Sequence, residues 1–329
     1  MRRVGWRVRQ LVLAATYLAA LLGLGFPACA AGAIDRIRAE GTLHCGAVER
    51  PGIAEVSPTG GAIGVAVDLC RAVAIAVLGP SGRVSFTLYD APHSYDGVRR
   101  GRDQVAFLTG GEIAAQDLGR FVVPGPTVLV STIGIMVPEA SPVRRLGDLG
   151  GQMVCLLIGS LGQRALESTV ARLHLEISRL AFEEDVEMLD AYNVGKCGAV
   201  VGEATYLADF RRNSGVRHLA SRLLPEILAA DPIIAVTPQA DGAWAADVAW
   251  VIDALLLSDA PADAWVAQAA DAVPVQHPTG LRQGWRADVS AAVGSYGAIV
   301  RRDLTDLLGL APGPNALWPS GLLLPPSVR

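Results

Sequence analysis

The chain has 329 residues, of which 51% are hydrophobic, so it is long enough to bury one large core or two medium-sized ones. Its formal net charge is −4 at pH 7. This acidic balance argues against a nucleic acid as partner, because phosphate backbones select basic surfaces.

The first 30 residues have the layout of an export signal. Four arginines in MRRVGWRVRQ precede the apolar run LVLAATYLAALLGLGF, and small residues with Ala-x-Ala spacing follow. We expect cleavage near Ala30 and a periplasmic mature chain with 24 basic and 32 acidic residues, a net charge of −8. An uncleaved membrane anchor and lipidation of Cys29 are the alternatives. The apolar run is short for a membrane span, and FPA is a poor context for lipoprotein cleavage.

The next elements alternate between helix and strand. IDRIRAEGTLHCGAV predicts a short amphipathic helix, a glycine stop and a buried strand, and VAVDLCRAVAIAVLG predicts a helix that ends at Gly79. GRVSFTLYD and QVAFL predict strands on either side of a short helix in SYDGVRRGR. This order is typical of an α/β layer with parallel strands.

The same alternation then begins again. Strands are predicted in MVCLLI, ISRLAF and GAVVG, and helices in GSLGQRALESTVARLHL, DVEMLDAYNVG and EATYLADFRRN. Two extended pieces, PGPTVLVSTIGIMVPEASPV and DPIIAVTPQ, separate the two runs, and the second leads into the helix GAWAADVAWVIDALLLSD. We therefore expect two α/β lobes joined by two crossings, with a hinge and a cleft between them. The Gly- and Pro-rich tail from Pro274 contains one further helix, SYGAIVRRDLTDLLGL.

Four cysteines remain after the signal: Cys45, Cys70, Cys155 and Cys197. An even number in an exported chain indicates disulfides. Neighbourhood in the sequence favours the pairs Cys45–Cys70 and Cys155–Cys197, one in each half. Four buried free thiols are the alternative.

Known catalytic and metal-binding patterns are missing from the sequence. The five histidines are scattered without metal-ligand spacing, and neither a Gly-x-Ser-x-Gly elbow nor a phosphate-binding loop occurs. We therefore predict no metal, no cofactor and no enzymatic activity.

Two positions in the second run are candidate ligand contacts. Gly159 and Ser160 lie between a strand and a helix, where free N–H groups favour an anion, and Arg164 could add a charge. Ser160 could equally be a simple helix cap. Glu203 follows a strand and opens a helix, so it could hold a ligand ammonium or merely interact with the helix dipole.

The stretch VAFLTGGEIAAQ raises a different question. The strand stops at Thr109 and is expected to break into a loop, in which paired glycines let something approach the backbone closely. Glu112 follows alone, with no lysine or arginine in the segment.

Taken together, these pieces resemble the family 3 solute-binding proteins of polar amino acid ABC transporters, and in particular the general L-amino-acid-binding subgroup. The resemblance covers Ile34 to the C-terminus. It rests on GTLHCGAVERPGIAE, VAVDLCRAVAIAVLG, TIGIMVP, MVCLLIGSLGQ, DAYNVGKCGAVVGE, LLPEIL, SYGAIVRRDL and GPNALWPSGLLLPP.

The resemblance implies a type II two-lobe periplasmic binding protein with a C-terminal extension. Its expected division is a signal peptide over 1–30, lobe 1 over 34–135 plus 236–329, and lobe 2 over 136–235. It implies a monomeric receptor that closes over an amino acid or amino-acid-like solute and delivers it to an inner-membrane permease.

The family's ligand contacts are only half kept. Ser160 stands at the helix-start hydroxyl and Glu203 at the acid that meets the ammonium. In the other lobe, Thr109, Gly110 and Glu112 form the expected cleft wall, but Gln116 stands where the family has its carboxylate-binding arginine. Ile53 replaces the aromatic that covers the ligand side chain, and Ile63 replaces a tryptophan-like position. We therefore expect ordinary α-amino acids to bind weakly and a less acidic or cationic solute to fit better.

Two other functions stay open at this stage. One is an accessory or sensory protein that has lost solute binding. The other is a dehydratase-like enzyme on the same fold, with Glu203 or Glu112 as general acid.

Overall fold

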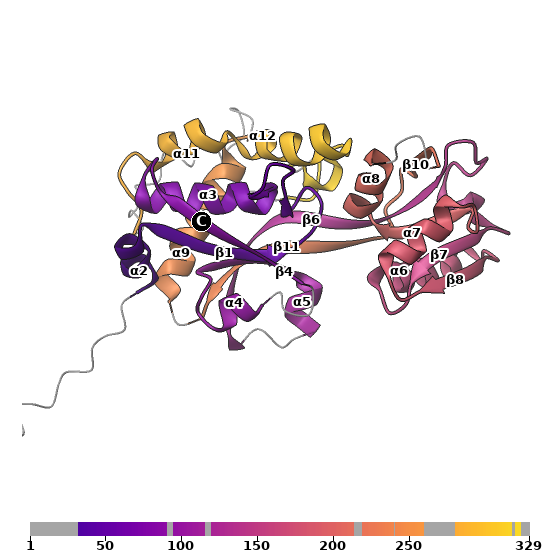
Figure 1. Ribbon diagram of the computed structural model, residues 1–329, viewed down its shortest axis with the longest axis horizontal. Helices are drawn as coiled ribbons and strands as arrows, with labels where there is room; N and C mark the ends of the chain where they lie inside the picture. Colours follow the sequence, from indigo (N-terminus) through magenta and orange to yellow (C-terminus); the bar gives the residue numbers. More distant parts are fainter. Residues whose placement is uncertain are drawn as a thin grey trace, which may run out of the picture.

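The computed structural model describes residues 32–90, 95–115, 120–213, 219–239, 241–259, 280–317 and 320–323. The predicted export signal and Gln116 therefore lie outside the described residues. Figure 1 shows an elongated molecule with two α/β parts placed end to end.

The first lobe is built on three parallel strands in the order β4-β1-β5. Helices α3, α11 and α12 run along one face of this sheet, and α4 and α5 lie on the opposite side (Figure 1). The elements before the crossings are α2 (Ala33–Glu40), β1 (Thr42–Val48), β2 (Glu55–Val56), β3 (Ala62–Ile63), α3 (Val65–Leu78), β4 (Arg83–Tyr89), α4 (Asp96–Arg99), β5 (Val105–Thr109) and α5 (Gly110–Ala115).

Strand β5 is buried along its whole length because both of its faces are covered. Val105 and Phe107 belong to the large core cluster with α3 and α9, whereas Ala106 and Leu108 belong to a separate cluster with Val98. Successive side chains of a strand point to opposite faces, so a strand that is buried on both faces needs apolar residues at every position.

The second lobe repeats this plan with parallel strands in the order β9-β7-β8. Val154 and Leu156 of β7 feed one core cluster, and the intervening Cys155 feeds another on the opposite face. Its elements are η3 (Leu146–Leu149), β7 (Met153–Leu157), α6 (Leu161–Leu173), β8 (Ser178–Phe182), α7 (Asp185–Asn193), β9 (Ala199–Glu203), α8 (Ala204–Arg212) and β10 (Ser221–Leu223).

The two lobes are joined by the long strands β6 (Val122–Pro138) and β11 (Ala229–Pro238), which pair antiparallel. Strand β11 also pairs with β5 of the first lobe, and β6 with β9 of the second. The hydrogen-bond ladder is thus continuous from end to end, while the apolar clusters remain largely separate. Two register shifts interrupt the β6–β11 pairing around Ile234, so the crossing is irregular on the first-lobe side.

The C-terminal part returns to the first lobe and contacts the crossing. Its elements are α9 (Gly242–Leu257), α11 (Trp285–Val293), α12 (Tyr296–Val300), the π-helical turn η4 (Arg301–Asp306) and η5 (Gly313–Asn315). The Tyr296 hydroxyl donates to the carbonyl of Val128 at 2.8 Å. The Asn315 amide bonds both backbone groups of Val130, accepting from N–H at 2.6 Å and donating to C=O at 3.1 Å.

These two side chains occupy an edge of β6 that β9 does not reach, since the β6–β9 pairing begins only at Ile133. On the other side Val130 faces Pro232, which has no N–H to offer. Tyr296 and Asn315 therefore satisfy backbone groups that would otherwise be buried without partners. Tyr296 and Asn315 thus form a C-terminal clasp on the crossing strand β6.

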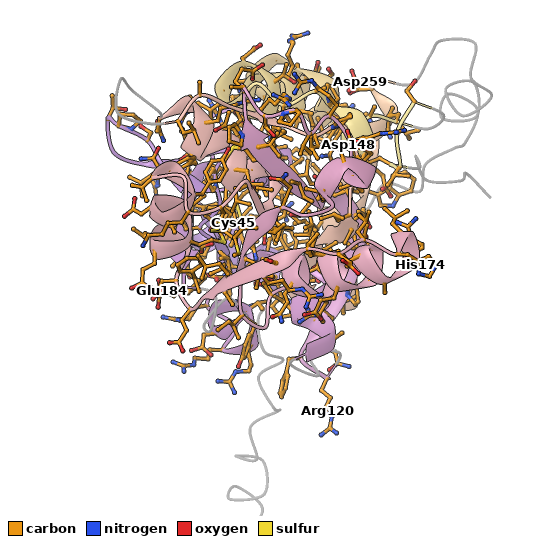
Figure 2. All side chains as sticks on the ribbon, turned by 90° about the vertical axis from the view of Figure 1, so that its right-hand side faces the viewer. Cys45, Arg120, Asp148, His174, Glu184 and Asp259 are labelled. Carbon is orange, nitrogen blue, oxygen red and sulfur yellow. A yellow bond between two sulfur atoms is a disulfide. The ribbon has the colours of Figure 1, made fainter. Side chains whose placement is uncertain are left out.

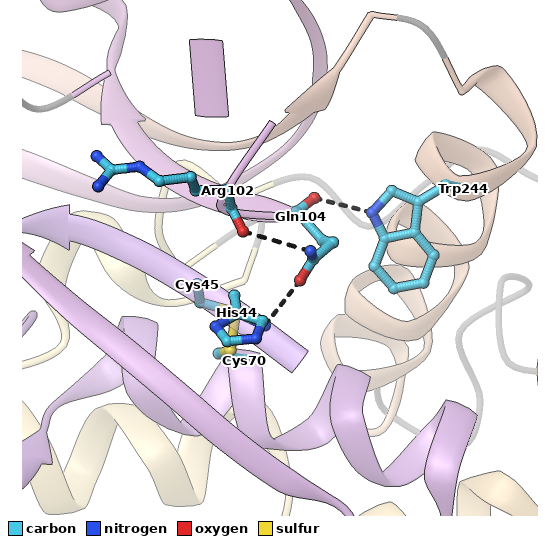
Figure 3. Close-up of a disulfide and its surroundings, with 6 residues drawn as sticks. All are labelled: His44, Cys45, Cys70, Arg102, Gln104 and Trp244. Carbon is cyan, nitrogen blue, oxygen red and sulfur yellow. Dashed lines mark hydrogen bonds between the residues drawn. A yellow bond between two sulfur atoms is a disulfide. The ribbon is translucent and has the colours of Figure 1, made fainter. Parts of the chain in front are cut away.

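Both predicted disulfides are confirmed: Cys45–Cys70 ties β1 to α3, and Cys155–Cys197 ties β7 to the segment before β9. Figure 3 shows the polar network beside the first. The Gln104 side-chain oxygen accepts from the His44 backbone N–H at 2.8 Å, and its carbonyl accepts from the Trp244 indole at 2.8 Å.

The predicted helices and strands agree closely with those of the structure. The clearest exception follows Thr109, where a helix, α5, replaces the expected loop. Polar side chains such as Arg120, His174 and Glu184 stand at the periphery, whereas Cys45 lies inside (Figure 2). No helix within the described residues has the length and apolar content needed to cross a membrane.

Candidate functional site

The loop after β1 places a cation between the lobes. In parallel α/β sheets, the loops that follow the strand carboxyl ends form the ligand site. Here Arg50 exchanges backbone hydrogen bonds with Ala54, which ties the loop into a tight turn. A Cβ at Gly52 would lie 2.7 Å from the carbonyl of Asp303, and its φ is +71°, so glycine is required for the loop to pack against η4.

The guanidinium of Arg50 lies between carboxylates of both lobes. Its Nη2 is 3.6 Å from Glu112 Oε1 in the first lobe, and its Nε is 3.4 Å from Glu203 Oε2 in the second. Only 11% of the Arg50 side chain is exposed. Burial lowers the Arg50 pKa, but Glu203 and Glu112 together outweigh it, so the net shift is upward and the charge is firmly held.

Arg50 corrects an expectation from the sequence, which saw this cleft wall as lacking a cation. The segment around Thr109 does lack one, but the β1 loop contributes it from about 60 residues earlier. The sequence held a signal for this: ERPG follows a buried strand of a parallel layer, which is where ligand contacts concentrate.

Thr109 and Glu112 form a capping box rather than a loop. The Thr109 hydroxyl accepts from the Glu112 N–H at 3.1 Å, and Glu112 Oε2 accepts from the Thr109 N–H at 2.7 Å. This reciprocal Thr-x-x-Glu pattern starts α5 and was readable in TGGE. The second oxygen, Glu112 Oε1, is buried without a hydrogen-bond partner among the described residues and faces Arg50.

The paired glycines allow the close approach that was expected of them. A Cβ at Gly110 would lie 3.2 Å from Pro232, and one at Gly111 would lie 2.9 Å from Asp231 Oδ2. The Gly111 N–H donates to Asp231 Oδ1 at 3.1 Å. The approaching group is thus a third carboxylate, contributed by the crossing strand β11.

The Glu203 carboxylate takes no part in capping a helix, unlike that of Glu112. It stands at the end of β9, and its side chain makes no capping hydrogen bond to α8, so it does not act as a helix cap. Its Oε2 accepts from the Ser131 hydroxyl at 3.3 Å, and 29% of the side chain is exposed. Burial raises the pKa of Glu203, against the lowering effects of Arg50 and Ser131.

Ser160 and Glu203 line one pocket of about 120 Å³ in the second lobe. Its other lining residues are Ile133, Leu157, Leu161, Gly162, Asp185, Met188, Leu189, Val201, Gly202, Tyr206 and Leu207. The structure thus brings together the two residues that were the leading candidates in this lobe.

At the start of α6, several of the groups that could bind an anion are already hydrogen-bonded within the chain. The Ser160 hydroxyl accepts from the Gln163 N–H at 3.0 Å and donates to the Leu157 carbonyl at 2.8 Å, so it caps the helix. The Gly159 N–H donates to Gln163 Oε1 at 2.7 Å. Arg164 is exposed and folds back to the Gly159 carbonyl at 2.7 Å.

Ile53 lies away from the pocket. It is 2% exposed and belongs to the core of the first lobe. Among the described residues, no group of histidine, cysteine and acidic side chains could hold a metal ion.

Tyr206 adds a second direct link between the lobes. Its hydroxyl, from α8, donates to the carbonyl of Glu49 in the β1 loop at 2.8 Å. Burial raises its pKa to about 12, so the hydroxyl remains a donor at neutral pH. Sequence reasoning missed Tyr206, Ser131 and Asp231. Tyr206 lies three residues after Glu203, but its partner Glu49 is distant in the chain. Ser131 and Asp231 come near Glu203 only in the folded crossing.

Comparisons with known proteins point to one functional class. No family model matches the chain. The general L-amino acid-binding periplasmic protein AapJ of Rhizobium johnstonii is 26% identical over 345 residues, covering 98% of this chain and 100% of the relative. The glutamate/glutamine/aspartate/asparagine-binding protein BztA of Rhodobacter capsulatus is 24% identical, covering 93% of this chain and 95% of the relative.

A solved structure shares the fold over most of the chain. It is an ABC transporter/periplasmic binding protein from Brucella ovis with glutathione bound, with a TM-score of 0.71 and 24% identity, covering 91% of this chain and 100% of that one. YhdW of Escherichia coli, whose name describes an amino-acid ABC transporter-binding protein, is 23% identical over 320 residues, covering 92% of this chain and 93% of the relative. These relatives confirm the resemblance seen in the sequence: the chain is a relative of the periplasmic solute-binding proteins of amino-acid ABC transporters.

Proposed function

We propose that this protein is the extracytoplasmic solute-binding receptor of an ABC importer. It binds an amino acid or amino-acid-like solute between its lobes and passes it to a membrane permease. The observation that carries this proposal is the interlobe contact of Arg50 with Glu112 and Glu203, next to the pocket that Ser160 and Glu203 share.

The binding step follows from the placement of these groups on separate lobes. A solute that contacts Glu203 and the first-lobe wall together has more contacts when the lobes are closed, so it favours the closed state. We place the division between the lobes within β6 and β11, a few residues before the expected boundaries at 135–136 and 235–236. Ile133 of β6 already pairs with β9 of the second lobe, and Ile233 of β11 already pairs with β5 of the first lobe. The C-terminal clasp on β6 holds one side of this crossing while the second lobe moves.

The names of AapJ and BztA support an amino-acid-like ligand, and the name of YhdW, with its ABC transporter, supports a permease partner. All three are named as binding proteins, and we propose no covalent step. The mature receptor is expected to be a periplasmic monomer, produced by cleavage near Ala30.

A thermal-shift screen of the mature chain tests the proposal. The solutes are amino acids, their amides, polyamines, opines and small organic acids. A true ligand at 100 times its Kd stabilises the folded state by about 2.7 kcal/mol and raises Tm by several degrees.

The hit is then titrated calorimetrically against two variants. Glu203→Gln should weaken binding roughly 30-fold or more, because it removes a charged partner from a partly dry site. Glu187→Gln makes the same charge change on an exposed position of α7 and should leave affinity unchanged. The proposal would be contradicted if no solute of the panel raised Tm. It would also be contradicted if the Glu203→Gln variant bound the solute with unchanged affinity.

A further inference from the structure

The charges around Glu203 are not balanced. Within the described residues, Arg50 is the basic side chain that pairs with these carboxylates, and it faces Glu112 and Glu203 together. Asp231 stands close enough to raise the Glu203 pKa further. Two carboxylates therefore share the Arg50 guanidinium and a third stands nearby, so acidic side chains outnumber basic ones in the described part of the site.

The pocket beside Glu203 has the same bias. The described residues that line it include the carboxylates of Glu203 and Asp185 and no basic side chain. Arg164, the nearest candidate cation in the sequence, bonds the Gly159 carbonyl instead. The remaining walls are mainly aliphatic, from Leu157, Leu161 and Leu189.

A free carboxylate entering this site would meet few unused donors. The N–H groups of Gly159 and Gln163 are already bonded within the α6 cap. Arg50 would have to leave Glu112 or Glu203 to receive it, and like charges brought together in a partly dry site oppose binding. An ammonium has the opposite balance: it pairs with Glu203 while Arg50 stays with Glu112, and no charge is left unmatched between them.

We propose that the solute is recognised as a cation: a primary amine with a small aliphatic body and no free carboxylate beside the amine. This inference rests on the proposed function and specifies its ligand class. The pocket volume of about 120 Å³ equals about four water volumes, so it fits an ammonium with a few carbons while the rest of the solute extends into the cleft.

Arg50 takes part as a specificity-determining residue. Arg50 pairs with both Glu112 and Glu203. An incoming amine replaces Arg50 at Glu203, while the pair of Arg50 with Glu112 remains. Because Arg50 keeps Glu112 as its partner, a second amine on the solute finds no unpaired carboxylate at that position. In the wild type, Glu112 is therefore not available to a second ammonium.

The primary test compares acids with their neutralised counterparts on the unmodified protein. Calorimetric titration at pH 7 uses L-leucine, L-leucinamide and 3-methylbutylamine, and in parallel L-arginine and agmatine. We expect each compound without the carboxylate to bind at least tenfold more tightly than its amino acid. An amino acid that binds as tightly as its amide or amine would overturn the inference, while still supporting the receptor function.

A second test uses Arg50→Met with 3-methylbutylamine and putrescine. Removing the guanidinium leaves Glu112 without its cation, so the variant should shift its preference towards the diamine by at least fivefold relative to the wild type. An unchanged preference would overturn the role given to Arg50. Binding by none of these probes or the wider panel would instead count against the receptor function itself.

Discussion

Replacing Asn315 with leucine should destabilise the first lobe strongly. The Asn315 amide is the described partner of both backbone groups of Val130 on that edge of β6, and the side chain is buried. Leucine has the same number of side-chain heavy atoms and the same branch at Cγ, so no space is left empty, but the N–H and C=O of Val130 lose their partners. An unsatisfied buried polar group costs about 1–3 kcal/mol, so the expected loss is about 2–6 kcal/mol.

Urea unfolding at pH 7, followed by tryptophan fluorescence and circular dichroism, measures this loss. A destabilisation of about 3 kcal/mol should lower Tm by roughly 6–12 °C for a lobe of this size. Tyr296→Phe removes a single hydrogen bond, to Val128, and should cost less than Asn315→Leu. Asn213→Leu makes the same exchange at the exposed end of α8 and should change stability by about 0.5 kcal/mol or less. A loss below about 1 kcal/mol for Asn315→Leu would refute the reasoning, since it would mean that water replaces the amide.

Three further outcomes are expected. Burial and the neighbouring Asp68 carboxylate raise the pKa of Asp303 from 3.8 to about 7, so the folded chain binds this proton more tightly than the unfolded chain. Proton binding therefore stabilises the fold at low pH, and this contribution is lost as pH rises from about 4 through 7. Asp303→Asn should flatten that slope, by on the order of 2–3 kcal/mol between pH 5 and 8 in urea unfolding, and an unchanged slope would argue against it. Replacing Cys155 and Cys197 together by serine removes a disulfide between positions 42 residues apart, and should lower the free energy of unfolding by about 4 kcal/mol in the same assay. A loss below about 1 kcal/mol would show that this disulfide contributes little to stability. Tyr206→Phe removes the interlobe bond to Glu49 and should weaken solute binding up to about tenfold in calorimetry with little change in unfolding; equal affinity would show that this bond does not favour closure.

Local patterns were sufficient for most of the elements. The glycine after Glu40 ends α2 in a left-handed conformation, and the apolar period of three to four residues marks α3 as a buried helix. Sequence neighbourhood also identified both disulfides, because each links elements within one lobe. The prediction of a loop after Thr109 is wrong: paired glycines are typical of loops, but the Thr-x-x-Glu spacing in TGGE forms a capping box that starts α5.

The site residues that were predicted from the sequence are those marked by local patterns, and the residues that were missed depend on contacts between distant parts of the chain. The pairing of Ser160 and Glu203 in one pocket was anticipated, since both follow strands of the same parallel layer. Arg50 was not, because its partners lie 62 and 153 positions away and neither distance leaves a local pattern. Asp231 and Ser131 were missed for a related reason: only the register of β6 against β11 sets them opposite each other.

By itself, then, the sequence determined the alternation of helices and strands, the two-lobe plan, the covalent links and the acid at the end of β9, because capping, periodicity and chain proximity act over a few residues. Only the tertiary structure decided which charges meet between the lobes and which side chains clasp the crossing strand. Those contacts depend on strand register and on loops packed from distant parts of the chain, where electrostatic pairing and the need to satisfy buried backbone groups select the partners.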